Sequence, residues 1–136
     1  MIVATSTGKV EGAPAGDGHH DIVQFRGMPY AQAERFRPPR PATPWVGVRD
    51  ATSFSAVAPQ NVSATDQLFG LAPDAADEDC LTLNVFTPAA DDGGRPVLVW
   101  VHGGGFTSGC GHLPHYDACN LIDAADGDLV VVSFNY

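Results

Sequence analysis

Basic residues are scarce in this sequence. Lys and Arg together number 7 against 16 Asp and Glu, which gives a formal net charge of −9. Nucleic acids and anionic membrane surfaces attract positive charge, so this balance disfavours both as partners. No apolar run comes near the roughly 20 residues that cross a bilayer. A chain of 136 residues with these properties is expected to form one globular domain with its own core.

Secretion signals and an even set of cysteines are lacking as well. The segment from Met1 to Gly12 has no basic stretch followed by a long apolar run, and so does not resemble a signal peptide. The three cysteines cannot all pair within one chain. Without a route of export, reduced thiols in the cytoplasm are the expectation.

The first half of the sequence alternates short strand patterns with turns. Residues 1–12 predict a hairpin, residues 12–21 a polar, glycine-rich turn, and residues 22–27 another strand. Prolines then crowd residues 28–45. Because proline fixes φ and lacks an N–H donor, this segment should wrap over a surface in extended conformation rather than enter a sheet. Residues 59–79 show no periodicity and predict a long surface loop.

The second half is more regular. Apolar, β-branched runs predict strands at residues 81–88, 96–103 and 128–136, and a short helix that Asp117 caps and Gly127 ends precedes the last of them. Nearly continuous apolar strands separated by a helix are typical of a parallel sheet covered on both faces. The sequence supplies too few helices to cover such a sheet, so we expect the chain to be part of a larger α/β fold.

Three consecutive glycines follow the strand 96–103 in the motif His102–Phe106, "HGGGF". When a nucleophile attacks an ester carbonyl, negative charge develops on one oxygen, and preorganised backbone N–H groups stabilise that charge. Glycine lets backbone donors approach a ligand because it has no Cβ and tolerates unusual φ values. The carboxyl end of a strand is also where α/β folds bind ligands. The motif therefore predicts an oxyanion loop of the lipase and esterase type, with a plain flexible turn as the alternative.

Four further segments carry the same resemblance in the same order. They are "FRGMPYAQAERFRPPRPATPW" (25–45), "DATSFSAVAPQ" (50–60), "EDCLTLNVFTP" (78–88) and "DLVVVSFNY" (128–136). Together with "HGGGF" they resemble the type B carboxylesterases over essentially the whole chain. The resemblance implies an α/β-hydrolase fold, of which residues 1–136 would form the N-terminal portion of a single domain: the N-terminal hairpin and the first strands of the mostly parallel central sheet.

The same resemblance implies roles for individual residues. The backbone N–H groups of Gly104 and Gly105 would be oxyanion donors, and Gly103 would shape the turn. Arg35 and Glu78 would pair as a structural salt bridge. The complete enzyme would act on small carboxylic esters and would need no cofactor.

The catalytic triad of the family is missing from this sequence. No serine fits the nucleophile pattern G-x-S-x-G, and Ser108, the nearest in place, has Phe106 where the first glycine should stand. The acid and the histidine of the triad have no counterpart either. We expect the chain alone to be inactive and to need the remainder of the esterase domain as its partner. In secreted relatives the cysteine at the position of Cys80 forms a disulfide with a cysteine just before the "PQ" pair. Here Ala58 occupies that second position, so the resemblance favours a cytoplasmic, bacterial-type member.

Other side chains admit more than one interpretation. Phe106, Phe69 and Leu68 are candidates to line the substrate pocket, although the last two could instead cover the core. A rival hypothesis is a metal site, built from a set of possible zinc ligands that lie within ten residues: Cys110, His112, His115 and Cys119. Their spacing matches no known metal motif. A non-catalytic interaction module of the same fold is the second rival.

Overall fold

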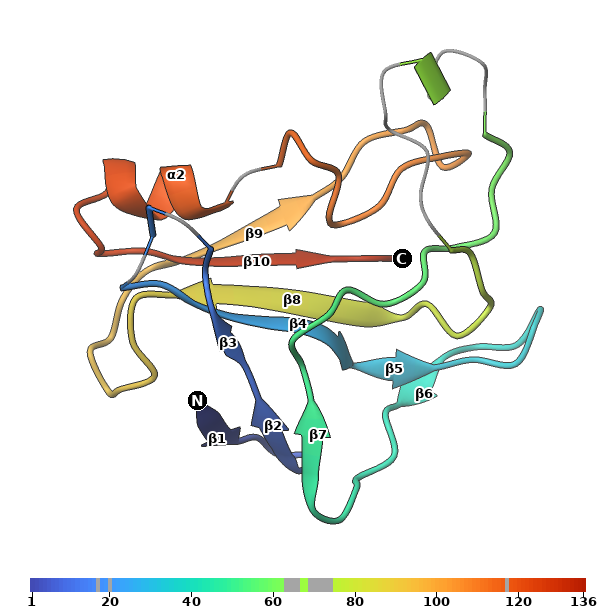
Figure 1. Ribbon diagram of the computed structural model, residues 1–136. Helices are drawn as coiled ribbons and strands as arrows, with labels where there is room; N and C mark the ends of the chain where they lie inside the picture. Colours follow the sequence, from blue (N-terminus) through green and yellow to red (C-terminus); the bar gives the residue numbers. More distant parts are fainter. Residues whose placement is uncertain (17, 20, 63–66, 69–74, 117) are drawn as a thin grey trace.

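A five-stranded sheet forms the centre of the molecule in the computed structural model, which describes residues 1–16, 18–19, 21–62, 67–68, 75–116 and 118–136. The strand order is β3-β4-β8-β10-β9 (Figure 1). The strands are β3 (Ala13–Pro14), β4 (Val23–Pro29), β8 (Thr82–Thr87), β9 (Val97–Val101) and β10 (Val130–Phe134). The strands predicted at 22–27, 81–88, 96–103 and 128–136 are therefore present.

The sheet is mixed rather than parallel throughout this portion. β9 and β10 run parallel, with helix α2 (Ala118–Ala124) in the connection between them. The ladders that join β10 to β8, β8 to β4 and β4 to β3 are antiparallel. A continuous apolar run reports burial but not strand direction, so the sequence pattern predicted the parallel arrangement correctly only for β9 and β10.

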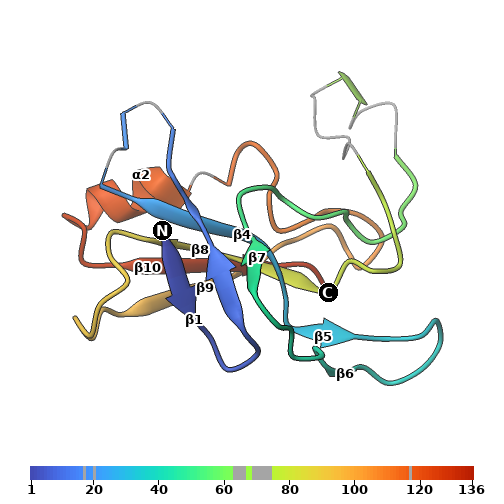
Figure 2. The ribbon, with the colours of Figure 1, turned by 60° about the horizontal axis from the view of Figure 1, so that its bottom comes forward.

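A second, three-stranded sheet contains the predicted N-terminal hairpin. β1 (Ile2–Ala4) and β2 (Lys9–Glu11) pair antiparallel, and β7 (Val48–Asp50) adds to β2 in parallel. This sheet packs against one face of the central sheet, and α2 packs against the other. Figure 1 shows α2 above the central sheet and the N-terminal strands below it, and in Figure 2 the N-terminal strands come to the front.

The proline-rich segment enters sheets at two points, which corrects the prediction for residues 28–45. Pro29 is the last residue of β4, and Pro41 lies in β6 (Arg40–Pro41), which pairs with β5 (Ala31–Gln32). Both positions are compatible with a missing N–H donor, because a strand end or a two-residue edge ladder leaves one side of the backbone unpaired.

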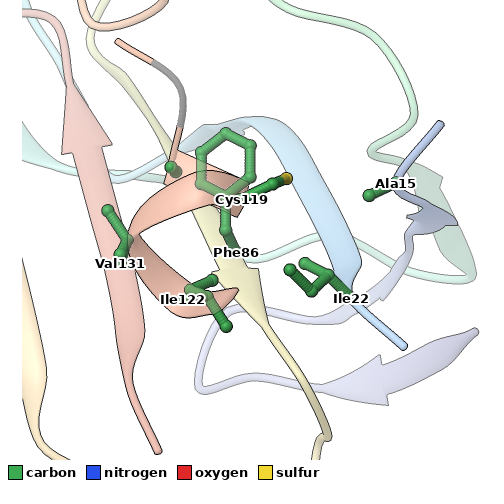
Figure 3. Close-up of a cluster of buried hydrophobic side chains, with 7 residues drawn as sticks. Ala15, Ile22, Phe86, Cys119, Ile122 and Val131 are labelled. Atoms are coloured by element: carbon green, nitrogen blue, oxygen red, sulfur yellow. The ribbon is translucent and has the colours of Figure 1, made fainter. Parts of the chain in front are cut away.

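Two separate hydrophobic clusters fill the two faces of the central sheet. The α2 side contains Ile22, Phe86, Cys119, Ile122 and Val131, drawn in Figure 3 with Ala15. The opposite side is built from three buried residues: Val10, Phe25 and Ala51. Adjacent residues of a strand point to opposite faces, which is why neighbouring Val85 and Phe86 of β8 serve different clusters.

The C-terminal end of α2 is close to its predicted place. The helix ends at Ala124, and the N–H of Gly127 donates a 3.0 Å hydrogen bond to the carbonyl of Ile122. Gly127 has φ of +75°, a value that favours glycine after a helix. The predicted cap, Asp117, lies outside the described residues.

Strand β9 is not buried as its sequence predicts. Val97, Val99 and Val101 are 58%, 57% and 59% exposed, because β9 is the edge strand of the sheet and neither α2 nor the N-terminal sheet covers that face. Of the helices in the described part of the chain, none has the length and apolar character needed to span a membrane.

Candidate active site

The glycine motif forms a tight turn directly after β9, seen in Figure 1 as the orange loop beyond the β9 arrow. The carbonyl of Gly104 accepts hydrogen bonds from the N–H groups of Thr107 at 3.0 Å and Ser108 at 3.2 Å. Gly104, Gly105 and Phe106 have φ values of +122°, +60° and +61°. The loop therefore passes through three successive residues in a region of φ that L-amino acids rarely adopt.

Glycine is required at one of the three positions and favoured at a second, for different reasons. A Cβ on Gly104 would lie 1.9 Å from the carbonyl oxygen of Ser108, so the turn can close only without a side chain there. A Cβ on Gly105 would meet open space, so glycine is favoured there only by its positive φ. Gly103 has neither constraint, and it contributes its carbonyl oxygen, which accepts a 2.8 Å hydrogen bond from Nδ1 of His102.

Unused backbone donors lie on the exposed side of this turn. Within the part of the chain that the structure describes, the N–H groups of Gly104 and Gly105 donate no hydrogen bond, and both residues are exposed. Gly105 lines an open hollow together with apolar side chains, among them Val101, Phe106 and Phe134. Free N–H donors at the rim of an apolar hollow can bind an oxyanion and the hydrophobic group attached to it.

His102 holds the entry to the turn. Its side chain is buried, and because a carbonyl only accepts, Nδ1 carries the proton in the bond to Gly103. The imidazole stacks on Tyr136 with ring centroids 4.4 Å apart and an angle of 17°. The hydroxyl of Tyr136 donates a 3.0 Å hydrogen bond to the carbonyl of His102. These contacts give the histidine a structural task at the base of the loop.

Asn135 is a buried polar residue that the sequence patterns did not single out. Its Oδ1 accepts a 2.9 Å hydrogen bond from the N–H of Gly111, just beyond the glycine loop. Its Nδ2 donates to the carbonyls of Ala56 at 3.2 Å and Cys80 at 3.3 Å. One side chain thus ties three distant segments together behind the loop. The only local signal is an amide residue placed directly after a buried strand.

Ser108 does not have the surroundings of a nucleophile. Its backbone N–H closes the turn onto Gly104. Among the described residues, no histidine or carboxylate makes a hydrogen bond with its hydroxyl. A serine nucleophile needs an adjacent base within hydrogen-bond reach. Among the described residues, Ser108 therefore has no base within hydrogen-bond reach.

The remaining predicted site residues lie in different places. Nε of Arg35 is 3.3 Å from Oε1 of Glu78, so the implied pair is present, with side chains 70% and 54% exposed. Phe106 stands at the lip of the hollow and is 91% exposed. Leu68 is 80% exposed, so it does not cover the core, and it is not among the residues that line the described hollow. Phe69 lies outside the described residues.

The four possible zinc ligands do not gather around a common point. His112 stacks on Phe54 with ring centroids 4.5 Å apart, His115 contacts Tyr116, and Sγ of Cys119 accepts a hydrogen bond from Gln24. Among the residues described, no cluster of three or more His, Cys, Asp or Glu side chains is arranged to hold a metal. The metal-site hypothesis finds no support in this arrangement.

All three cysteines are buried, and none of them forms a disulfide. Burial raises the pKa of Cys80, and the nearby Glu78 and Asp79 raise it further. Burial likewise raises the pKa of Cys110. A thiol whose pKa is raised stays protonated at neutral pH and is a poor nucleophile or metal ligand.

Comparison with known proteins places these features in a family. The family model described as "Carboxylesterase family" matches residues 1–136. Phenmedipham hydrolase of Pseudarthrobacter oxydans is 49% identical over an alignment of 121 residues. This alignment covers 85% of this chain and 24% of that protein. Para-nitrobenzyl esterase of Bacillus subtilis is 38% identical over 140 residues, covering 100% of this chain and 27% of that protein.

Solved structures agree with the sequence relatives. The carboxylesterase Est55 of Geobacillus stearothermophilus superimposes with a TM-score of 0.81 at 42% identity, over 99% of this chain and 26% of that chain. The chain thus spans about a quarter of the length of the relatives it matches, at their N-terminal part. Family model, sequence and fold agree along the whole chain, and it belongs to the carboxylesterase family, whose members have the α/β-hydrolase fold.

Proposed function

We propose that residues 102–106 form the oxyanion loop of an ester hydrolase, with the backbone N–H groups of Gly104 and Gly105 as two of its donors. The observation that carries this proposal is that Gly104 and Gly105 are exposed residues at the carboxyl end of β9 whose N–H groups donate no hydrogen bond within the described part of the chain. As an ester carbonyl becomes tetrahedral, its oxygen gains charge, and donors already in place stabilise it without reorganisation. The apolar hollow beside the donors suits the hydrophobic part of a small carboxylic ester.

The nucleophile, the acid and the base of the reaction would come from outside this chain. No serine in the sequence fits the nucleophile pattern, and Ser108 has no base beside it. Enzymes without triad members retain only about 10³–10⁴ of acceleration over water, and even this needs a formed site. Residues 1–136 alone are therefore inactive in this proposal.

Residues 1–136 are, in the same proposal, the N-terminal portion of one α/β-hydrolase domain. Two features support this: β9 is an edge strand, where the remaining strands of the domain would pair, and Val97, Val99 and Val101 leave one of its faces uncovered. Three buried cysteines without a disulfide suit the reducing cytoplasm of a bacterial-type member.

A chimera tests the proposed function. The first quarter of phenmedipham hydrolase is replaced by residues 1–136, so that the relative supplies the rest of the fold. We expect the chimera to hydrolyse para-nitrophenyl esters and to react with a fluorophosphonate probe, and the 136-residue chain to do neither. Stoichiometric labelling of the chain alone would contradict its inactivity.

The donors are tested by Gly105→Ala against Gly47→Ala. Both glycines have positive φ, +60° and +86°, and at both a Cβ would meet open space, so the local strain is matched. Only Gly105 carries a proposed donor. Gly105→Ala keeps the N–H but adds a methyl group beside it and strains its φ, so in the chimera kcat should fall by less than the roughly 10²–10³-fold that complete loss of one oxyanion donor causes, while Gly47→Ala leaves kcat unchanged. Equal effects of the two substitutions would contradict the assignment.

A further inference from the structure

The far end of the glycine loop is held by a side chain from another part of the chain. Gln60 is the last residue of the segment 50–60 and lies 49 residues before Gly109. Its Oε1 accepts a 2.8 Å hydrogen bond from the N–H of Gly109, and its Nε2 donates a 3.0 Å hydrogen bond to the carbonyl of the same residue. The carboxamide thus pairs with one backbone unit through both a donor and an acceptor, as a neighbouring β-strand would.

Gly109 is the point at which the loop closes on its own entry. Its φ is +102°, and a Cβ there would lie 2.5 Å from the carbonyl oxygen of Gly103 and 2.7 Å from Nδ1 of His102. The backbone of Gly109 therefore rests directly against the residues that begin the turn. Whatever fixes Gly109 also fixes the separation between the two ends of the loop, and with it the direction of the N–H groups of Gly104 and Gly105.

Gln60 is itself well anchored. Its Nε2 also donates a 3.1 Å hydrogen bond to the carbonyl of Ala58 within its own segment. Val57, which is 1% exposed, has its N–H bonded to the carbonyl of Ala75 at 3.0 Å, and its carbonyl accepts from the N–H of Asp77 at 2.9 Å. The amide therefore projects from a segment held by both backbone and core, and its rotamer is restricted by a third hydrogen bond.

We infer that Gln60 is a positioning residue of the oxyanion loop: it holds Gly109 against the loop entry so that the Gly104 and Gly105 donors keep one direction. This inference rests on the proposed function for its catalytic consequence, but not for the contact itself. Gln60 touches no reacting atom and acts only through Gly109. Its loss leaves the donors present but no longer fixed, which affects the transition state more than substrate binding.

The test compares Gln60→Met, Gln60→Glu and a control, Gln67→Met, which alters an exposed glutamine of the same loop region. Methionine keeps the length of the side chain and removes all three of its hydrogen bonds, including the two to Gly109. Glutamate keeps the acceptor for the Gly109 N–H and loses the donor. Amide hydrogen exchange is followed by NMR at residues 103–109 in the chain and in the chimera with phenmedipham hydrolase, and kcat and KM are measured separately in the chimera.

We expect exchange at the Gly109 amide to be roughly 2- to 10-fold faster in Gln60→Met, the range for one net hydrogen bond, and largely restored in Gln60→Glu. In the chimera, kcat should fall about 10- to 100-fold in Gln60→Met with KM nearly unchanged, because only the direction of the donors is disturbed. Unchanged exchange at Gly109, or a loss confined to KM, overturns the inference. A third outcome separates the two proposals. If exchange at Gly109 is faster in Gln60→Met but the chimera has no esterase activity even with Gln60 intact, the contact of Gln60 with Gly109 is supported and the proposed function is refuted.

Discussion

Strands β9 and β10 are neighbours with similar sequences, but they differ in solvent exposure. β10, "VVVSF", has Val131 at 3% and Ser133 at 4% exposure, since α2 covers it and β8 and β9 flank it. β9, "VLVWV", pairs on one side only, and Val99, on the face of the sheet opposite α2, remains 57% exposed. The apolar composition of a strand thus predicts that it is buried, but the elements that pack around it determine whether it is buried within this chain.

A charge introduced at Val131 should give the largest effect. Val131→Lys places an ammonium group between Phe86 and Ile122 in the α2-side cluster, without a partner. Burial of an unpaired charge belongs to the most damaging class of substitution, and we expect a loss of about 4 kcal/mol or more in the free energy of unfolding. Urea unfolding followed by circular dichroism measures it. A variant as stable as the parent would mean that this cluster is not the core.

The same substitution in β9 should leave folding almost untouched. Val99→Lys adds its charge to an exposed face, so stability should change by less than about 0.5 kcal/mol. A lysine on an edge strand opposes pairing between copies of the chain. Sedimentation velocity should therefore show less self-association than for the parent chain. Loss of folding in Val99→Lys would show that β9 is buried, and the contrast with β10 would fail.

Buried thiols should make stability depend on alkaline pH. Burial raises the pKa of Cys80 and Cys110 in the folded state. The contribution of these protonated thiols to the free energy of unfolding is therefore fully present below the ordinary thiol pKa of about 8.5. It is lost as pH rises through the raised pKa, because the unfolded chain releases its protons first. Burial raises the pKa of Tyr30 as well and adds in the same direction.

Urea unfolding at pH 7 and pH 10 measures this dependence. The double variant Cys80→Ala, Cys110→Ala should keep only the part that comes from Tyr30 and other groups. An equal pH dependence in both proteins would contradict the thiol contribution. Rapid alkylation of the native thiols at pH 7 would do so independently, since protonated and buried thiols react slowly.

The Arg35–Glu78 pair should contribute least. Both side chains are more than half exposed, and exposed ion pairs stabilise proteins by about 0.2–1 kcal/mol. A double-mutant cycle with Arg35→Ala and Glu78→Ala isolates the coupling energy, which should shrink further at 1 M salt. A coupling well above this range would assign the pair a larger part in the fold than its exposure indicates.

The candidate site was partly predictable because part of it is local. The turn after β9 depends on φ values and on a contact between Gly104 and Ser108, only four residues apart, so the motif itself carries the information. Gln60 and Asn135 carried no such signal. Gln60 reaches Gly109 across 49 residues, and Asn135 reaches Ala56 across 79. No local pattern encodes contacts at that separation.

The fold divides in the same way. The positions of the four longer strands of the central sheet, the N-terminal hairpin and the need for glycine in the loop follow from short-range sterics and hydrophobic patterning, and the sequence determined them by itself. The direction of strand pairing, the exposure of β9 and the side chains that hold the oxyanion loop were decided only by the tertiary structure. These properties depend on which distant segments become neighbours, and that is a result of packing the whole chain rather than a property of any segment within it.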